Sequence, residues 1–372
     1  MKAGQRAELA YRGLESIESN TGRFNEAGLS KTPEVPLANS FRFGPEHVLY
    51  GKLRPYLNKV ALAEFEGKCS TEIIPLLPSP ELDRRFLAYF LRSPRTVSRI
   101  SEKAAGARMP RADMDFIFSL ELVLPSLTEQ RRIVDLLSRA DSIVRLRRDA
   151  QNKAAELIPA IFVAMFGDPA TNPKGWPVVP LGESLRSVDY GSSTKASDDG
   201  NGIPLIRMGN VGYDGSLDLS NLKYAQLENA EVEKYRLSQG DILFNRTNSK
   251  ELVGKTGLWG GGLDAVVASY FIRLRVKQDL LSPVYLWAFM NARHMKRVLF
   301  DTARGAIGQA NINSKELRSF RIGLPPLPLQ DAFKRYVDFA ESIIAQQDDA
   351  LDKAKATFEA LLARSFTTEA LV

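Results

Sequence analysis

The chain contains Leu124-Pro-Ser-Leu-Thr-Glu-Gln130 and, 200 residues later, Leu324-Pro-Pro-Leu-Pro-Leu-Gln330, which are two versions of one segment. The offset of 200 residues holds without a gap through Phe166 and Phe366. Upstream the match continues with small shifts, so that Val48-Leu-Tyr50 matches Ile242-Leu-Phe244. Self-similarity at a fixed period indicates a repeated structural unit. The 372 residues are therefore predicted to form two copies of a unit of roughly 200 residues.

Each quoted segment leads into apolar residues spaced in steps of three and four, which form a narrow stripe along a helix. The second helix must return toward the first to cover this stripe, so we predict two long helices that pair antiparallel as in a coiled coil. The alternative is an amphipathic helix that lies on its own domain. The positions expected to pair are Ile133, Leu137, Ala140 and Val144 in the first copy and Phe333, Val337, Ala340 and Ile344 in the second.

Both stripes are interrupted at the same place, by Arg147 in the first copy and by Gln347 in the second. Polar residues in such a seam cost stability but fix the register of the two helices. Pro159 has no backbone N–H and is predicted to kink or end the first helix, whereas its counterpart is Glu359. The two helices are therefore not expected to be identical.

The part of each copy that precedes its helix is predicted to belong to the α+β class. In one strand of the second copy, Arg273 and Arg275 alternate with apolar residues, which predicts a half-buried strand with one cationic face. A segment rich in Gly, Pro and Asn, residues 165–175, marks the boundary before the second copy. The expected elements of that copy are strands over 203–208, 241–246 and 266–276 and a helix from Pro283 to about Phe300.

Composition limits the classes of protein to which this chain can belong. The 50 Lys and Arg residues outnumber the 44 Asp and Glu residues, and the net charge of +6 is compatible with a polyanionic partner. With one cysteine, Cys69, and two histidines, His47 and His294, a disulfide framework within the chain and Cys/His zinc sites are excluded. There is no run of about 18 apolar residues that could span a membrane, and the first residues lack the apolar core of a signal peptide. We therefore expect a cytoplasmic protein without a metal site or a membrane association.

Gly254-Lys255-Thr256 matches part of a phosphate-binding loop. The full motif requires a glycine five residues before Gly254, where this sequence has Ser249, so nucleotide binding is not predicted. Residues 245–250 and Lys255 are interpreted instead as a polar, basic loop beside a strand. Such a loop suits DNA, because Arg can bond guanine bidentately, Asn can bond adenine, and Lys and Thr suit phosphate oxygens. A solvated hairpin tip without a function is the alternative.

The order and spacing of these features resemble the specificity subunits of type I restriction–modification systems. The resemblance extends over nearly the whole chain and includes several local phrases. These are Gly240-Asp-Ile-Leu-Phe-Asn-Arg246 with Leu252-Val-Gly-Lys-Thr256, Gly308-Gln-Ala-Asn-Ile312, and Phe166-Gly-Asp-Pro169 leading to Trp176-Pro.

The resemblance implies an α+β fold with two pseudo-repeated target recognition domains, separated by a pair of long antiparallel coiled-coil helices. Each domain would contact half of an asymmetric bipartite site in double-stranded DNA, and the chain would be a non-catalytic DNA-reading subunit. The implied boundaries are 1–125 for the first recognition domain, 126–167 for the central helix, 168–325 for the second recognition domain and 326–372 for the C-terminal helix.

The resemblance also implies partners and cofactors. The chain would dock two methyltransferase subunits, which use S-adenosylmethionine, and restriction subunits, which are translocases and nucleases that use ATP and Mg²⁺. The chain itself is expected to bind no cofactor and to carry no catalytic residue. The alternatives are a scaffold or adaptor whose repeated domains bind protein instead of DNA, and, from another class, a P-loop enzyme or a fused endonuclease.

On this interpretation, residues of both domains contact bases or phosphates. Candidate contacts in the second domain are Arg246, Asn248, Lys250 and Lys255, with Arg304 and Gln309 as further candidates. The first domain has Lys52, Arg54, Lys59, Arg108 and Arg111 in comparable places.

Overall fold

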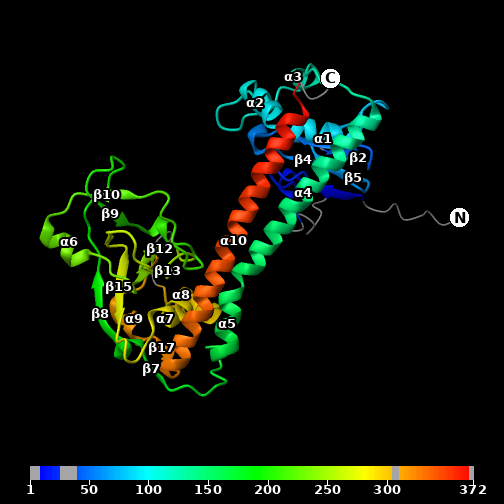
Figure 1. Ribbon diagram of the computed structural model, residues 1–372. Helices are drawn as coiled ribbons and strands as arrows, with labels where there is room; N and C mark the ends of the chain where they lie inside the picture. Colours follow the sequence, from blue (N-terminus) through cyan, green and yellow to red (C-terminus); the bar gives the residue numbers. More distant parts are fainter. Residues whose placement is uncertain (1–8, 26–39, 304–309, 368–372) are drawn as a thin grey trace. The chain divides into compact units, whose positions relative to one another are not determined.

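A computed structural model describes residues 9–25, 40–303 and 310–367 of the chain (Figure 1). Its contacts divide it into two compact units. Unit 1 comprises Met1–Gln151 and Gln347–Val372, and unit 2 comprises Asn152–Gln346. The division falls within the long helices, since α4 (Leu127–Ala155) ends just beyond Gln151 and α10 (Leu327–Ser365) contributes residues to both units.

Unit 1 contains two small sheets and a group of helices (Figure 1). In the sheet of order β4-β3-β6, both neighbours run antiparallel to β3, which is buried along its whole length. Successive residues of a strand point to opposite faces. Val48 and Tyr50 accordingly pack in a cluster with helical residues, while Leu49 packs in another cluster with Phe43. The strands are β1 (Ala10–Arg12), β2 (Ser40–Phe43), β3 (Val48–Gly51), β4 (Val60–Leu62), β5 (Gly67–Ser70) and β6 (Ile73–Leu76).

The helices of unit 1 begin at residues that suit helix starts. Asp83 accepts hydrogen bonds from two backbone N–H groups of the first turn of α1. Ser93 ends α1 and caps α2, whose first residue is Pro94. The helical elements before α4 are η1 (Leu14–Ser16), η4 (Pro55–Leu57), α1 (Arg84–Arg92), α2 (Pro94–Glu102) and α3 (Met114–Phe118).

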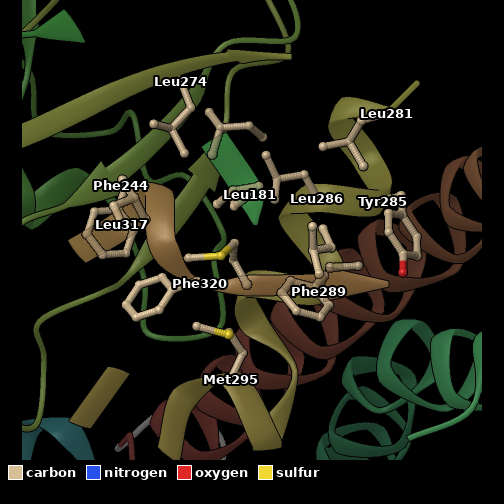
Figure 2. Packing of buried hydrophobic residues seen from close by; sticks show 14 of the residues in the cluster. Leu181, Phe244, Leu274, Leu281, Tyr285, Leu286, Phe289, Met295, Leu317 and Phe320 are labelled. Atoms are coloured by element: carbon tan, nitrogen blue, oxygen red, sulfur yellow. The ribbon is translucent and has the colours of Figure 1, made fainter. Parts of the chain in front are cut away.

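Unit 2 repeats this plan with an additional strand in its main sheet. Strand β11 pairs antiparallel with β13 and β15, as β3 pairs with β4 and β6, and β8 extends the sheet to the order β13-β11-β15-β8. A second sheet has the order β10-β9-β14. Figure 2 shows Phe244 of β11 and Leu274 of β15 in one cluster with Phe289 of α7, Met295 of α8 and Leu317 of α9. This cluster is the main core of unit 2.

The elements of unit 2 before α10 are as follows. The strands are β7 (Val178–Pro180), β8 (Leu185–Tyr190), β9 (Ile203–Ile206), β10 (Lys223–Ala225), β11 (Ile242–Asn245), β12 (Thr247–Asn248), β13 (Thr256–Leu258), β14 (Val266–Val267), β15 (Phe271–Val276), β16 (Ala310–Asn311) and β17 (Arg321–Gly323). The helical elements are α5 (Leu157–Phe166), η5 (Leu181–Ser184), η6 (Met208–Asn210), α6 (Asn229–Tyr235), α7 (Pro283–Asn291), α8 (Arg293–Thr302) and α9 (Ser314–Ser319).

Two predicted elements of the second copy are divided in the structure. The strand expected over 266–276 is two strands in different sheets, because Phe271 N donates to Ala268 O in a turn between β14 and β15. The helix expected from Pro283 is two helices, α7 and α8, separated at Ala292, whose backbone is extended. The predictions of the strands over 203–208 and 241–246 are confirmed by β9 and β11.

The predicted cationic face of β15 is wrong. Arg273 is buried, and its Nη2 lies 3.3 Å from Asp189 Oδ2, while Arg275 Nε donates to Asp241 Oδ1 over 2.8 Å. The hydrogen bond to Asp241 raises the pKa of Arg275. Both guanidinium groups are therefore neutralised inside unit 2, and they are not available to an external polyanion.

Helix α4 ends at Ala155 and α5 begins at Leu157. Pro159 lies in the first turn of α5, and a proline ring clashes with the carbonyl of the residue four positions earlier, which here is Ala155. The prediction that Pro159 breaks the first helix is therefore confirmed. The corresponding part of α10, around Glu359, continues without interruption to Ser365.

The apolar stripes of the long helices are buried within each unit. In unit 1, the residues of the α4 stripe share a cluster with α1 and with the second half of α10. In unit 2, the stripe of the first half of α10 shares the main core with α5. The unit 1 members are Ile133, Leu137, Ala140 and Val144 with Leu351, Phe358 and Leu362. The unit 2 members are Phe333, Val337, Ala340 and Ile344 with Ile158, Phe162 and Phe166.

Candidate nucleic-acid interface

In unit 2, the candidate residues follow the central strand β11. The backbone of Arg246 is fixed on both sides, because its N–H donates to Tyr270 O over 2.9 Å and its carbonyl accepts from Ile312 N over 2.9 Å. The next residues form β12, which pairs antiparallel with β16. Residue 246 and its neighbours therefore lie in a short ribbon that is anchored to the end of the sheet.

The buried side-chain amide of Asn245 holds this ribbon in place by hydrogen bonds. Asn245 has no exposed surface, and its Nδ2 donates to Thr247 O and Tyr270 O over 3.3 and 3.2 Å. Its Oδ1 accepts from Asn248 Nδ2 over 2.9 Å, and Asn248 Oδ1 accepts from Ser249 N over 2.9 Å. Asn248 is predicted from the sequence to contact a base. In the structure, however, both its Nδ2 and its Oδ1 form hydrogen bonds within the loop.

Two cations of the ribbon lie over aromatic rings. The guanidinium carbon of Arg246 is 4.8 Å from the ring centroid of Tyr190, and Lys250 Nζ is 4.4 Å from that of Phe300. Contacts of this kind hold a cation in place without neutralising its charge. Sequence reasoning did not identify Tyr190 or Phe300, because nothing in the residue pattern shows that they are exposed beside the loop.

Lys255 occupies a different position from the one predicted. It is only 8% exposed, and its Nζ donates to Met208 O over 2.7 Å. Burial lowers the pKa of this amine. Lys255 therefore supports η6 from the interior and is not a surface cation. Thr256, which follows it, begins strand β13 and not a helix, so the local fold also differs from that of a phosphate-binding loop.

Unit 1 has equivalent residues at two of these positions. Lys52 corresponds to Arg246, because Lys52 O accepts from Ala112 N over 2.8 Å as Arg246 O accepts from Ile312 N. Lys59 corresponds to Lys255, since its Nζ donates to Leu14 O, at the start of η1, over 2.9 Å. The structure therefore shows that Lys52 and Lys59 of the first domain occupy the same positions as Arg246 and Lys255 of the second.

The remaining candidates are placed as follows. Arg54 is exposed, and its backbone has a positive φ of 51°. Arg111 is also exposed, but it forms a two-pronged ion pair with Glu72, with Nη2 and Oε1 2.9 Å apart. Arg108 is exposed. Arg304 and Gln309 lie outside the described residues.

The described residues can also be searched for groups of metal ligands and for membrane-spanning helices. Within residues 9–25, 40–303 and 310–367, no group of three or more His, Cys, Asp or Glu side chains could hold a metal ion. None of the helices in these ranges is long and apolar enough to cross a membrane. Cys69 is a buried thiol of β5, and burial raises its pKa to about 12.

Comparisons with known proteins identify relatives over nearly the full length. A model of the type I restriction modification DNA specificity domain matches residues 37–156 and 173–348. The specificity subunit of the type I restriction enzyme EcoKI from Escherichia coli (strain K12) is 24% identical over 373 residues, which cover 94% of this chain and 80% of the relative. The StySPI specificity subunit from Salmonella potsdam is 24% identical over 370 residues, with the same coverage of 94% and 80%.

Two solved structures share the fold. A chain from a study of complex assembly and conformational transition of the type I R-M system matches with a TM-score of 0.62 and 22% identity, over 97% of this chain and 92% of that one. The S subunit of a type I restriction-modification system from M. genitalium matches with a TM-score of 0.55 and 14% identity, over 97% and 89%. The two matched segments of the family model together cover most of the sequence and coincide with the two repeats. The chain therefore belongs to the type I restriction–modification DNA specificity family.

Proposed function

We propose that this chain reads an asymmetric, bipartite site in double-stranded DNA, with one recognition domain for each half. As a member of its family, it supplies DNA sequence specificity to a type I restriction–modification system. The observation that carries the bipartite proposal is the equivalence of Lys52 and Arg246, which follow the central strands β3 and β11. Equivalent positions with different cations suit two half-sites of different sequence.

The proposed recognition domains span 1–125 and 168–325. In the second, Arg246 and Lys250 are the cations best placed for DNA, because aromatic contacts leave their charges unpaired. In the first, Lys52, Arg54 and Arg108 have the corresponding role. Asn248, Lys255 and Lys59 support the loops, since their polar atoms are engaged within the protein. Arg111 must exchange its bond to Glu72 for any phosphate contact.

We further propose that the long helices, 126–167 and 326–372, pair as an antiparallel coiled coil between the two domains. The support is that each half of α10 buries its stripe in a cluster with a helix of the first copy, α4 in unit 1 and α5 in unit 2. Helix α10 has 39 residues, so it is roughly 58 Å long. At about 3.4 Å per base pair, a rod of this length can hold two half-sites more than one turn of duplex apart.

The partners of such a subunit are methyltransferase and restriction subunits, and we propose that two methyltransferase subunits bind. The support is a pair of exposed apolar positions on the long helices. Leu136 of α4 and Tyr336 of α10 lie at equivalent places of the repeats and are 43% and 54% exposed. Ile143 and Phe339, farther along the same helices, are 52% and 67% exposed. Exposed apolar side chains that gather on a surface are typical of protein interfaces, and we propose this role for these four residues.

We assign no catalytic step and no cofactor to this chain. S-adenosylmethionine belongs in this scheme to the methyltransferase subunits, and ATP with Mg²⁺ to the restriction subunits. The complex acts on DNA, and its place of action is the cytoplasm.

The test is binding of the full chain to a pool of duplexes with randomised half-sites, at several salt concentrations. If about five phosphates are contacted, log affinity falls with log salt with a slope of about −4 to −5. Arg246→Ala is expected to weaken the preference in one half-site, and Lys52→Ala in the other. Arg139→Ala is the control, since this arginine is exposed on α4 and paired with Asp135.

A scaffold that binds only protein would give weak retention of DNA with a shallow dependence on salt and no enriched sequence. That result would contradict the proposed function. Enrichment of a single contiguous site, affected by both variants, would retain DNA reading but would overturn its bipartite form.

A further inference from the structure

Tyr190 and Arg246 lie together at one end of the main sheet of unit 2, where strands β8 and β11 finish. Strand β15 lies between β8 and β11, and its residue Ile272 is in register with Tyr190 on one side and Phe244 on the other. Residues in register share a face of the sheet, and the next residue but one returns to that face. Tyr190 and Arg246 are therefore on the same face, two strands apart. Neighbouring strands are about 4.8 Å apart, so the two backbones are separated by roughly 10 Å, which the arginine and tyrosine side chains bridge together.

The ring of Tyr190 is held at both of its ends. Its backbone belongs to β8, and its hydroxyl accepts a hydrogen bond of 3.4 Å from Ser314 N, the first residue of α9. The ring is nevertheless 42% exposed. The guanidinium carbon of Arg246 lies 4.8 Å from the centroid of this fixed ring, and a cation–π contact at this distance favours one position of the arginine side chain.

The contact with Tyr190 leaves the N–H donors of Arg246 unused. Its Nε is enclosed without a hydrogen-bond partner, and within the described parts of the chain neither Nη atom has a hydrogen bond or an ion pair. The contact with the Tyr190 ring engages the guanidinium through its π-face interaction and uses none of its N–H donors, so the two Nη groups stay free for an acceptor pair. The matching pair on a base edge is O6 and N7 of guanine in the major groove.

The other side chains of the ribbon do not have this property. Asn248, which could read adenine, is engaged with Asn245 and Ser249. Lys250 is an exposed ammonium, a point charge without a planar fork. Arg246 is thus the one side chain of residues 245–250 that offers a free, oriented, two-donor edge.

We infer that Tyr190 is a specificity-determining residue, and that it holds Arg246 to read a guanine in the half-site of unit 2. The inference rests on the proposed function, because it identifies a base and a positioning residue for the same interface. Tyr190 acts through Arg246, so its loss affects the preference for one base pair more than the overall attraction to DNA.

The test uses the full chain with duplexes randomised in both half-sites, and then with the selected duplex carrying single changes. We expect a G·C pair at one position of the half-site that Arg246→Ala perturbs. Replacing that guanine by adenine, or by 7-deazaguanine, which lacks the N7 acceptor, should weaken binding about 5- to 150-fold. Tyr190→Phe should keep the preference, and Tyr190→Leu should reduce it several-fold. Arg246→Lys should retain the salt dependence but lose most of the preference.

Tyr190→Leu must leave the preference intact in the other half-site and at the remaining positions of the unit 2 half-site. The second result separates loss of positioning from loss of unit 2 structure. The inference is overturned if Tyr190→Leu retains the full preference, if it weakens both half-sites equally, or if the position sensitive to Arg246 is not a guanine. A chain that binds no DNA at all would instead overturn the proposed function.

Discussion

Gln130 and Gln330 make matching hydrogen bonds in the two units. Gln130 Nε2 donates to Glu81 O and Pro125 O, and its Oε1 accepts from Asp83 N over 2.8 Å. Gln330 Nε2 donates to Leu280 O and Pro325 O, and its Oε1 accepts from Ser282 N over 2.7 Å. Asp83 and Ser282 are the N-cap residues that directly precede α1 and α7. The final glutamine of each repeated segment therefore ties the first turn of a long helix to the start of a domain helix.

Replacing either glutamine should be costly. Gln330→Ala leaves the N–H of Ser282 and the carbonyl of Pro325 buried without this partner and also removes the bond to Leu280 O. We therefore expect a loss of about 2–4 kcal/mol in the free energy of unfolding. Urea denaturation monitored by circular dichroism measures it. Gln346→Ala, at an exposed position of the same helix, should change the value by less than about 0.5 kcal/mol. Equal effects of the two substitutions would show that the buried amide is not important.

Asp241 is expected to be a centre of stability in unit 2. It is 2% exposed and accepts from Arg275 Nε and Ser238 N, and Arg273 Nε lies 4.0 Å away. Asp241→Ala leaves two guanidinium groups without their shared anion, so we expect a loss of about 3–5 kcal/mol in thermal or urea unfolding. Asp189→Ala, which removes a more exposed carboxylate, should cost clearly less, and the reverse order would contradict this role.

Leu136 and Leu137 should have separable effects, although they are adjacent in sequence. Leu137 has no exposed surface, and Leu137→Ala should lower the free energy of unfolding by about 2–5 kcal/mol. Leu136 is 43% exposed, so Leu136→Asp should leave stability nearly unchanged but weaken binding of the methyltransferase subunit. Denaturation and co-purification measure the two effects. A Leu136→Asp chain that retains full methyltransferase binding would rule out the proposed docking position.

Lys296 should make the stability of unit 2 depend on pH. Burial, partly offset by the charge of Asp214, lowers the pKa of Lys296 to about 8 in the folded chain. The pKa of a lysine in an unfolded chain is about 10.4. Between these values the unfolded chain binds more protons, so the free energy of unfolding should rise with pH, by no more than about 1.4 kcal/mol per pH unit.

The measurement is urea unfolding from pH 7.5 to 10, with Lys296→Met as reference. The wild-type chain should gain stability relative to this variant above pH 8, and Lys250→Met, at an exposed position, should follow the wild type. A constant difference between wild type and Lys296→Met across this range would contradict the prediction.

The parts of the fold that could be predicted are those encoded locally. The repeat, the strands β9 and β11 and the break near Pro159 follow from residue identity and spacing. The turn that divides β14 from β15 could not be predicted, because Ala268-Ser-Tyr270 contains no glycine or proline and the turn is fixed by Ser192 from a distant segment. The break at Ala292 likewise has no local breaker.

The candidate site shows the same limit. The basic loop after β11 was visible in the sequence, since polar and cationic residues cluster there. Sequence could not distinguish Lys255, whose ammonium is buried against Met208, from Lys250, which is exposed. It also could not show that Tyr190 lies beside Arg246, 56 residues later in the chain, because that contact depends on strand order.

The division of α10 between the units has a consequence for biosynthesis. Leu351, Phe358 and Leu362 belong to the cluster that also contains Phe86 and Leu137, more than 200 residues earlier. During translation these earlier residues emerge first, but the apolar surface they share with α10 stays uncovered until residues 351–362 have left the ribosome. Unit 2, whose core is drawn from residues 158–344, has all of its residues available before that moment. The module encoded first is therefore completed last, and a nascent chain stalled before residue 351 would expose an aggregation-prone surface.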